Sequence, residues 1–123
     1  MKTSERYPVT QGDVIVNYAS SLFDRTELTT DKALPADVYC GDILDSKTFA
    51  LYDSAAAVGE PVINLSDMSA DGQNKTLVIV DRHVVITDHF LRAKDAASKK
   101  AALTALTASG DVRLAINADY FKA

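Results

Sequence analysis

Residues 76–86, Thr-Leu-Val-Ile-Val-Asp-Arg-His-Val-Val-Ile, contain two apolar runs separated by a short polar step. The first five residues are leucine or β-branched, which favours a buried strand. Asp81 and Arg82 interrupt the apolar run with a turn-like polar pair, and residues 83–86 then resume it. The pattern predicts two strands close together in the chain and therefore a mainly β protein.

Further short strands are expected before this stretch. Residues 38–44 read as a first strand region with a bend at Gly41, and residues 49–52 read as a second strand that closes a hairpin with it. Residues 62–65 read as a third strand, with Pro61 at its start or on a sheet edge. The sequence thus predicts a compact unit of short strands.

One helix is predicted after the strands. Asp95 is a suitable N-cap for the alanine-rich run 96–109, and Gly110 follows as a C-terminal stop. A further short turn is expected after Asp88. Residues 111–116 then alternate between polar and apolar, as a half-buried strand does. The fold class is therefore mainly β with one or two short helices.

The first part of the chain is predicted to be a flexible, extended arm. Residues 1–33 hold little apolar material, whereas residues 34–123 carry the strand and helix signals. Val14, Val16 and Tyr18 alternate along the arm. An alternating segment can add a strand to a partner's sheet edge, so these three residues are the candidate binding site.

Composition excludes several classes of function. The chain has 123 residues and a net charge of -4, which fits one domain and argues against direct binding to nucleic acid. Its first residues lack the apolar core of a signal peptide, and no stretch reaches the roughly 20 apolar residues that span a bilayer. We expect synthesis in a host cytoplasm and no contact with membranes.

Charge is unevenly distributed along the chain. Residues 37–72 carry one lysine against seven acids, whereas residues 73–123 carry eight bases against five acids. One interpretation is an ordinary solvated surface. The other is that an acidic face of one subunit meets a basic face of the next.

Two histidines and their acidic neighbours are the only candidates for catalytic or metal chemistry. Asp81 and His83 would share one face of a strand, and Asp88 and His89 follow nearby. A carboxylate beside an imidazole can bind a divalent metal or act as an acid–base pair. The simpler interpretation is a turn with histidines at the surface or an interface. Because no nucleotide, hydrolase or metal motif accompanies them, we expect no catalysis, no cofactor and no metal.

Five segments from Ala33 onward follow one another in a suggestive order and spacing, namely residues 33–38, 47–53, 53–57, 77–82 and 95–102. In this order and spacing the chain resembles the bacteriophage head-decoration proteins, the group that includes the lambda capsid-stabilising protein. The resemblance covers about three quarters of the chain.

The resemblance implies a β-clip-like unit that assembles as a homotrimer. It also implies a place on the outer surface of the mature phage head, with an arm that orders against the major capsid protein. The expected function is therefore a structural virion protein that stabilises the capsid against internal DNA pressure. Two alternatives remain open, namely a tail or baseplate adaptor of the same phage and a trimeric β-clip nucleotide hydrolase.

Overall fold

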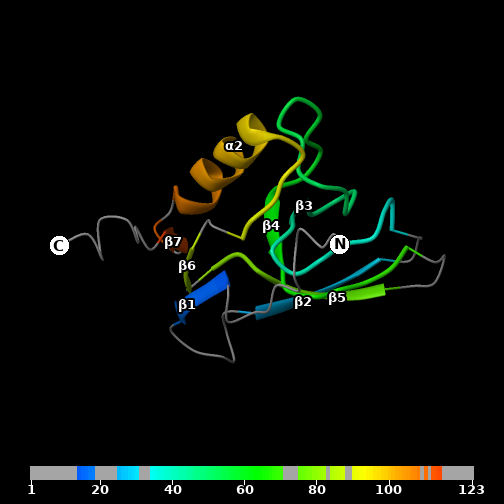
Figure 1. Ribbon diagram of the computed structural model, residues 1–123, viewed down its shortest axis with the longest axis horizontal. Helices are drawn as coiled ribbons and strands as arrows, with labels where there is room; N and C mark the ends of the chain where they lie inside the picture. Colours follow the sequence, from blue (N-terminus) through cyan, green and yellow to red (C-terminus); the bar gives the residue numbers. More distant parts are fainter. Residues whose placement is uncertain are drawn as a thin grey trace, which may run out of the picture.

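The computed structural model describes the chain over most of its length, and within that part the fold is mainly β with one helix (Figure 1). The described residues are 14–18, 25–30, 34–70, 75–82, 84–87, 90–108, 110 and 112–114. The elements are β1 (Ile15–Tyr18), β2 (Arg25–Thr30), β3 (Ile43–Asp45), β4 (Pro61–Asn64), β5 (Lys75–Val80), β6 (Val84–Ile86), α2 (Ala96–Thr107) and β7 (Val112–Leu114).

The larger sheet has four antiparallel strands in the order β2-β5-β4-β3. Strand β5, from the stretch that the sequence marked as buried, lies inside this sheet between β2 and β4. In the β3–β4 pair, Ile43 lies opposite Ile63 and Leu44 lies opposite Val62. Because neighbouring residues of a strand point to opposite faces, the two pairs bury opposite sides of the sheet.

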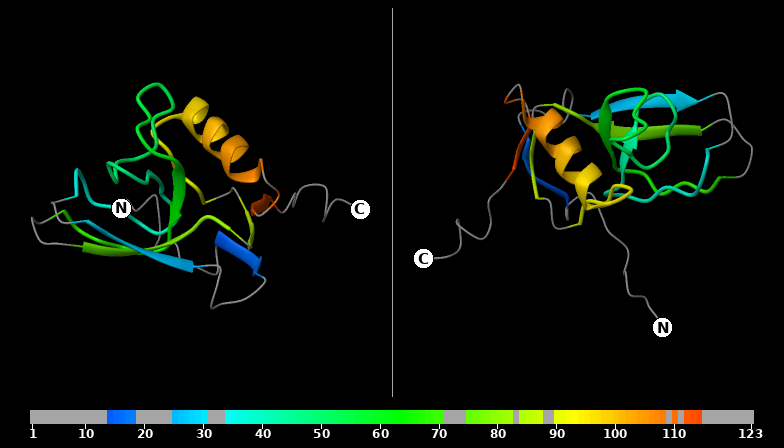
Figure 2. Two further views of the ribbon diagram at one scale, coloured as in Figure 1. Left: turned by 180° about the vertical axis from the view of Figure 1, so that it is seen from behind. Right: turned by 90° about the horizontal axis from the view of Figure 1, so that it is seen from above.

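The smaller sheet has three strands in the order β1-β6-β7. Strand β1 runs antiparallel to β6, while β7 runs parallel to it. A parallel pair needs a crossover connection, and α2 lies in the segment that joins β6 to β7. Figure 2 shows the helix beside this sheet, and α2 also contacts β4 of the larger sheet.

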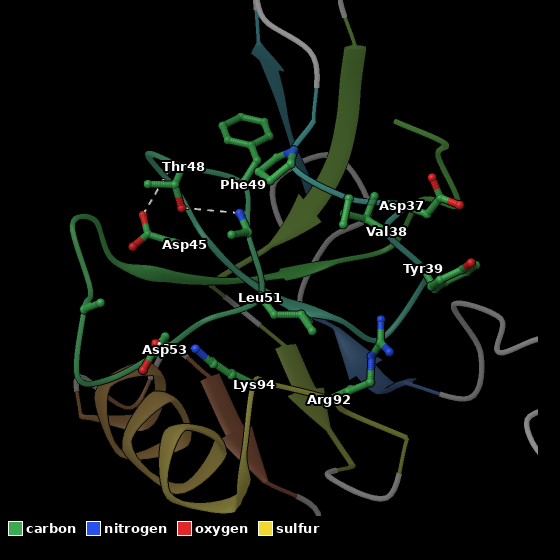
Figure 3. A pocket seen from close by; sticks show the side chains of 14 residues that line it. Asp37, Val38, Tyr39, Asp45, Thr48, Phe49, Leu51, Asp53, Arg92 and Lys94 are labelled. Carbon is green, nitrogen blue, oxygen red and sulfur yellow. Dashed lines mark hydrogen bonds and ion pairs between the residues drawn. The ribbon is translucent and has the colours of Figure 1, made fainter. Parts of the chain in front are cut away.

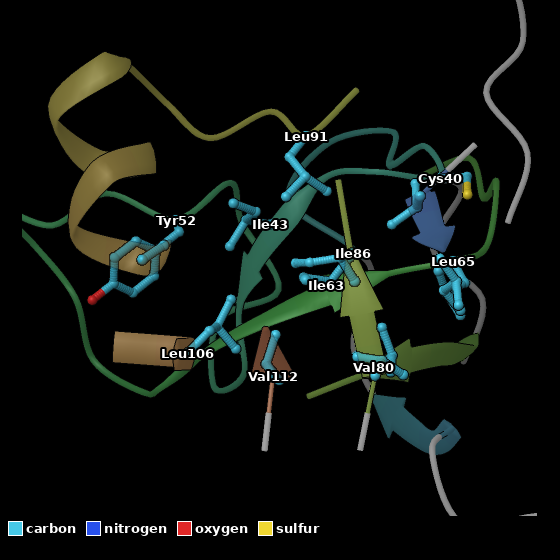
Figure 4. Packing of buried hydrophobic residues seen from close by; sticks show 14 residues of the cluster. Cys40, Ile43, Tyr52, Ile63, Leu65, Val80, Ile86, Leu91, Leu106 and Val112 are labelled. Carbon is cyan, nitrogen blue, oxygen red and sulfur yellow. The ribbon is translucent and has the colours of Figure 1, made fainter. Parts of the chain in front are cut away.

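Apolar side chains gather in two clusters on either side of the larger sheet. The helix-side cluster joins both sheets to α2 (Figure 4), and its buried members are Val14, Ile15, Cys40, Ile43, Tyr52, Ile63, Leu65, Val80, Val84, Ile86, Leu91, Ala102, Leu106 and Val112. The loop-side cluster is smaller, and its buried members are Leu34, Val38, Leu44, Phe49, Val62, Leu77 and Ile79.

The predicted helix is confirmed together with its end signals. The Asp95 side chain accepts a hydrogen bond from the Ser98 N–H at 2.7 Å, which satisfies one of the free donors of the first turn. Gly110 has a φ of +86°, the left-handed backbone expected just beyond a helix. The final predicted strand is also present as Val112–Leu114, and residues 111, 115 and 116 of that prediction lie outside the described residues.

The expected boundary between an arm at residues 1–33 and a domain at residues 34–123 requires correction. Strand β1 pairs with β6, and β2 pairs along its full length with β5. Val14 is fully buried in the helix-side cluster. The alternating residues were predicted to pair with the sheet edge of another protein. In the structure, β1 instead pairs with β6 of its own chain. The rest of the predicted arm lies outside the described residues.

The expected hairpin between residues 38–44 and 49–52 is present in a shorter form. Residues 43–45 and 50–52 meet in an antiparallel bridge, in which the Asp45 N–H donates to the Ala50 carbonyl and the Tyr52 N–H donates to the Ile43 carbonyl, whereas the regular ladder of β3 is formed with β4. Phe49 has a φ of +63°, which interrupts a regular strand at this point. The segment is therefore an irregular stretch beside β3.

Candidate functional site

An open, mostly apolar groove of about 870 Å³ lies on the loop side of the larger sheet (Figure 3). Residues 35–39 form one wall, and residues 48–51 with Asp53 form the other. Arg92 and Lys94 line the end of the groove nearest the helix. We call this feature the loop-side groove. Because its walls are irregular segments, their positions depend on polar contacts more than on strand pairing.

Asp45 is the main organiser of the loops around the groove. This residue is only 4% exposed. Its carboxylate accepts backbone hydrogen bonds from Lys47 at 2.8 Å, Val58 at 2.8 Å and Gly59 at 2.9 Å, with a longer bond from Thr48. One side chain thereby joins the turn after β3 to the loop before β4.

The hydrogen bonds to Asp45 also set its ionisation. Burial by itself would raise the pKa of this carboxyl, but the backbone donors from Val58, Lys47 and Gly59 outweigh burial and lower the pKa below its ordinary value. The carboxylate is therefore charged at neutral pH. Since its two oxygens are engaged by loop N–H groups, its charge is satisfied within the loops.

Arg92 and Asp42 form a paired charge at the helix end of the groove. Nε and Nη2 of Arg92 donate to the two Asp42 oxygens at 2.9 and 2.8 Å, and Asp42 is fully buried. The hydrogen bond to Asp42 raises the pKa of Arg92, so the guanidinium stays charged. The guanidinium also lies over the Tyr39 ring, 5.7 Å from its centroid. Carboxylate and ring together fix the guanidinium in place.

A second set of contacts ties the groove to the start of the helix. Lys94 Nζ lies 3.1 Å from Asp53 Oδ2, and the Ser54 N–H donates to the buried Ser98 Oγ at 2.9 Å. The Lys94 N–H donates to the Tyr52 carbonyl at 3.1 Å. The wall at residues 48–53 is thus bonded to α2 as well as to β3.

The opposite wall is held by hydrogen bonds between side chains and the backbone. Asp37 accepts from the Ala70 N–H at 2.8 Å, and Asp67 accepts from the Cys40 N–H at 2.8 Å. The fully buried Asn64 donates to the Tyr39 carbonyl at 3.0 Å. These bonds replace strand pairing where the backbone is irregular.

The three residues predicted to bind a partner are placed differently from expectation. The Val14 side chain is fully buried in the helix-side cluster, so it belongs to the core and is not exposed to a partner. The Tyr18 backbone pairs with Val84, and Val16 lies at an irregularity of the same ladder. The side chains of Val16 and Tyr18 lie outside the described residues.

The residues weighed for catalytic or metal chemistry are only partly described. Asp81 is described and forms an ion pair with its neighbour Arg82 at 2.9 Å, as the turn interpretation expects. His83, Asp88 and His89 lie outside the described residues. Among the residues that are described, no group of three or more His, Cys, Asp or Glu side chains could hold a metal ion.

Sequence reasoning did not find the loop-side groove. Its only visible signal was the run of acids between residues 37 and 67, which was interpreted as surface charge. Asp37, Asp45 and Asp67 in fact accept backbone hydrogen bonds from distant loops. Such pairings depend on tertiary structure, so spacing in the sequence does not reveal them.

Comparisons with family models, with curated proteins and with solved structures gave no match. In the part of the chain that the structure describes, no helix has both the length and the apolar character needed to cross a membrane.

Proposed function

We propose that this chain is a structural virion protein that binds the outer surface of the mature phage head as a homotrimer. In this role it stabilises the capsid against the pressure of packaged DNA, with the major capsid protein as its partner. One observation carries the proposal. The loop-side groove is lined chiefly by residues 35–38 and 48–51 with Asp53 and Ala56, which belong to segments that resemble the head-decoration proteins.

The geometry around the groove suits a protein that docks without carrying out chemistry. Its surface is mostly apolar, and Tyr39 at its edge is 44% exposed. Aromatic side chains at an accessible rim are frequent anchors of protein interfaces. A trimer would repeat this surface three times, so that individually weak contacts act together at high effective concentration.

The test uses purified protein and heads of the encoding phage that lack decoration. We expect co-sedimentation with expanded heads, weak or no binding to unexpanded heads, and greater resistance of decorated heads to heat-induced loss of DNA. Binding to isolated tails in place of expanded heads would instead support the tail or baseplate adaptor. Absence of binding to both would overturn the proposal.

A further inference from the structure

The wall of the groove at residues 49–53 has one bonded edge and one open edge. The Asp45 N–H donates to the Ala50 carbonyl at 2.9 Å, and the Tyr52 N–H donates to the Ile43 carbonyl at 2.8 Å. These bonds direct Ala50 and Tyr52 toward β3. In extended backbone the intervening residue directs its polar groups the opposite way, so the N–H and C=O of Leu51 point away from β3.

The open edge offers a short ladder of backbone groups. Within the described part of the chain, neither the N–H nor the C=O of Leu51 has a hydrogen-bond partner. By the same alternation the Asp53 N–H belongs to this edge, and within the same described ranges it too lacks a partner. An edge of this kind accepts an added strand.

The side chains around the open edge are apolar. Leu51 and Val38 line opposite walls of the groove, and Phe49 lies nearer the larger sheet (Figure 3). Leu51 is half-buried, so its unpaired backbone groups lie next to apolar surface. A bound strand would satisfy these groups and cover the apolar side chains together.

The charges around the groove favour an acidic ligand. Each acid that lines it is already engaged, since Asp37 accepts from Ala70, Asp45 from the loop N–H groups, and Asp53 from Lys94. Arg92 is different, because its bonds to Asp42 use Nε and Nη2, and Nη1 has no partner among the described residues. In Figure 3 the Arg92 side chain extends into the groove.

We infer that residues 49–53 form a docking edge for an extended segment of another protein, which adds a strand there. That segment places an apolar side chain against Val38 and Leu51 and an acidic side chain at Nη1 of Arg92. Backbone hydrogen bonds give affinity, while the apolar and acidic positions give selectivity. The inference does not depend on head decoration, since it concerns the chemistry of the ligand segment and not its source.

The first experiment selects ligands from a displayed library of random 12-residue peptides, with the full chain as bait. We expect enrichment of peptides that pair an apolar residue with Asp or Glu at a fixed spacing. No enrichment, or a consensus without an acidic residue, would overturn the inference.

The second experiment compares two adjacent amides by hydrogen exchange. With the best selected peptide bound, the Leu51 amide should exchange at least about tenfold more slowly, because a gained hydrogen bond of about 1.4 kcal/mol is a tenfold effect. The Tyr52 amide already donates to Ile43 and should change far less. Protection elsewhere with Leu51 unchanged would refute strand addition. Protection of Leu51 that rises with protein concentration and without peptide would make a second copy the occupant and overturn the partner proposed here.

The third experiment tests the contact between Arg92 and the acidic residue of the peptide. Arg92→Lys keeps a cation near Asp42 but removes Nη1, so affinity should fall about tenfold. The matched control is Arg82→Lys, since Arg82 pairs with Asp81 and does not line the groove. Replacing the peptide's acid by its amide should weaken binding to the unaltered chain and have little further effect on the Arg92 variant. If the losses of affinity from the two changes are additive, Arg92 and the acidic residue of the peptide do not meet. If the Arg92 variant folds poorly, the peptide change still tests the contact on the unaltered chain.

Discussion

The helix-side and loop-side clusters share one sheet but are enclosed in different ways. Ile43 and Ile63 face the helix side, while their neighbours Leu44 and Val62 face the loop side. The helix-side cluster is covered by a second sheet and by α2. The loop-side cluster is covered largely by residues 34–38 and 49–52, which form only isolated bridges.

This difference separates the part of the molecule that confers stability from the part suited to binding. Regular elements satisfy their own backbone groups and leave apolar side chains to pack. Irregular segments need side chains such as Asp45 to satisfy their donors, and they leave an open edge at Leu51. We therefore expect changes on the helix side and at Asp45 to alter folding, and changes to the open edge at Leu51 to alter binding.

Removal of residues 1–20 is expected to have the largest effect on stability. It deletes Val14 and Ile15, which are 0% and 8% exposed in the helix-side cluster. Burial of each such side chain contributes about 1.5–3 kcal/mol, so the free energy of unfolding should fall by roughly 3–6 kcal/mol. The measurement is denaturant unfolding, with a chain lacking only residues 1–12 as control. If the chain lacking residues 1–20 unfolds at the same denaturant midpoint as the full chain, β1 does not belong to the core.

Asp45→Asn is the corresponding test on the loop side. The amide offers one acceptor oxygen in place of two, so some of the N–H groups of Lys47, Thr48, Val58 and Gly59 lose their partner. Each stranded donor costs about 1–3 kcal/mol, and we expect a net loss of roughly 2–3 kcal/mol at neutral pH. Asp37→Asn, which alters a carboxylate with one backbone donor, is the milder control.

The same variant carries a pH signature with a defined sign. The folded-state pKa of Asp45 lies below its ordinary value of 3.8, so the charged form is favoured by folding. Its contribution is present above pH 3.8 and is lost as pH falls through the depressed folded-state pKa. The stability difference between the unaltered chain and Asp45→Asn should therefore shrink on acidification below about pH 4. A constant difference across this range would contradict the role of the charge.

The sequence predicted elements with local signals better than contacts between distant segments. Strand β5 is marked by a run of β-branched residues, and α2 is marked by an N-cap at Asp95 and a glycine just beyond its end. Both elements are present. The role of β1 was missed because alternation shows that a strand has an apolar face but not which edge it will join. The groove was missed because Asp45 contacts Val58 and Gly59 across 13 and 14 residues.

Two glycines give a finer comparison of the two sides. At Gly59 a Cβ would lie 2.9 Å from Asp45 Oδ1 and closer still to the Ser46 and Lys47 side chains, so space is limiting. At Gly110 a Cβ would meet nothing within 4 Å, but the φ of +86° disfavours other residues. We expect a loss of about 1–2 kcal/mol for Gly59→Ala and about 1 kcal/mol for Gly110→Ala.

Asparagine should destabilise the protein more than alanine at Gly59 and less than alanine at Gly110. Asn tolerates left-handed backbone, so Gly110→Asn should cost less than Gly110→Ala. The larger side chain should make Gly59→Asn cost more than Gly59→Ala. Thermal unfolding of the four variants measures both orders, and the same order at both sites would show that one cause acts at each.

The smallest expected effect concerns β2, the outer strand of the larger sheet. The Thr29 and Thr76 hydroxyls lie 2.9 Å apart on paired, cross-strand positions, and both residues are exposed. Cross-strand pairs of this kind contribute about 0.2–1 kcal/mol, and an exposed hydroxyl can exchange its partner for water. Thr29→Ala, Thr76→Ala and the double variant form a thermodynamic cycle that isolates the coupling between them. We expect a small positive coupling, which the single variants alone would not reveal, because each also changes strand propensity.

A coupling of zero, together with fast hydrogen exchange of the β2 amides, would show that residues 25–30 belong to the flexible arm predicted from the sequence and not to the sheet. A measurable coupling would instead confirm that this segment is part of the sheet covering the loop-side cluster.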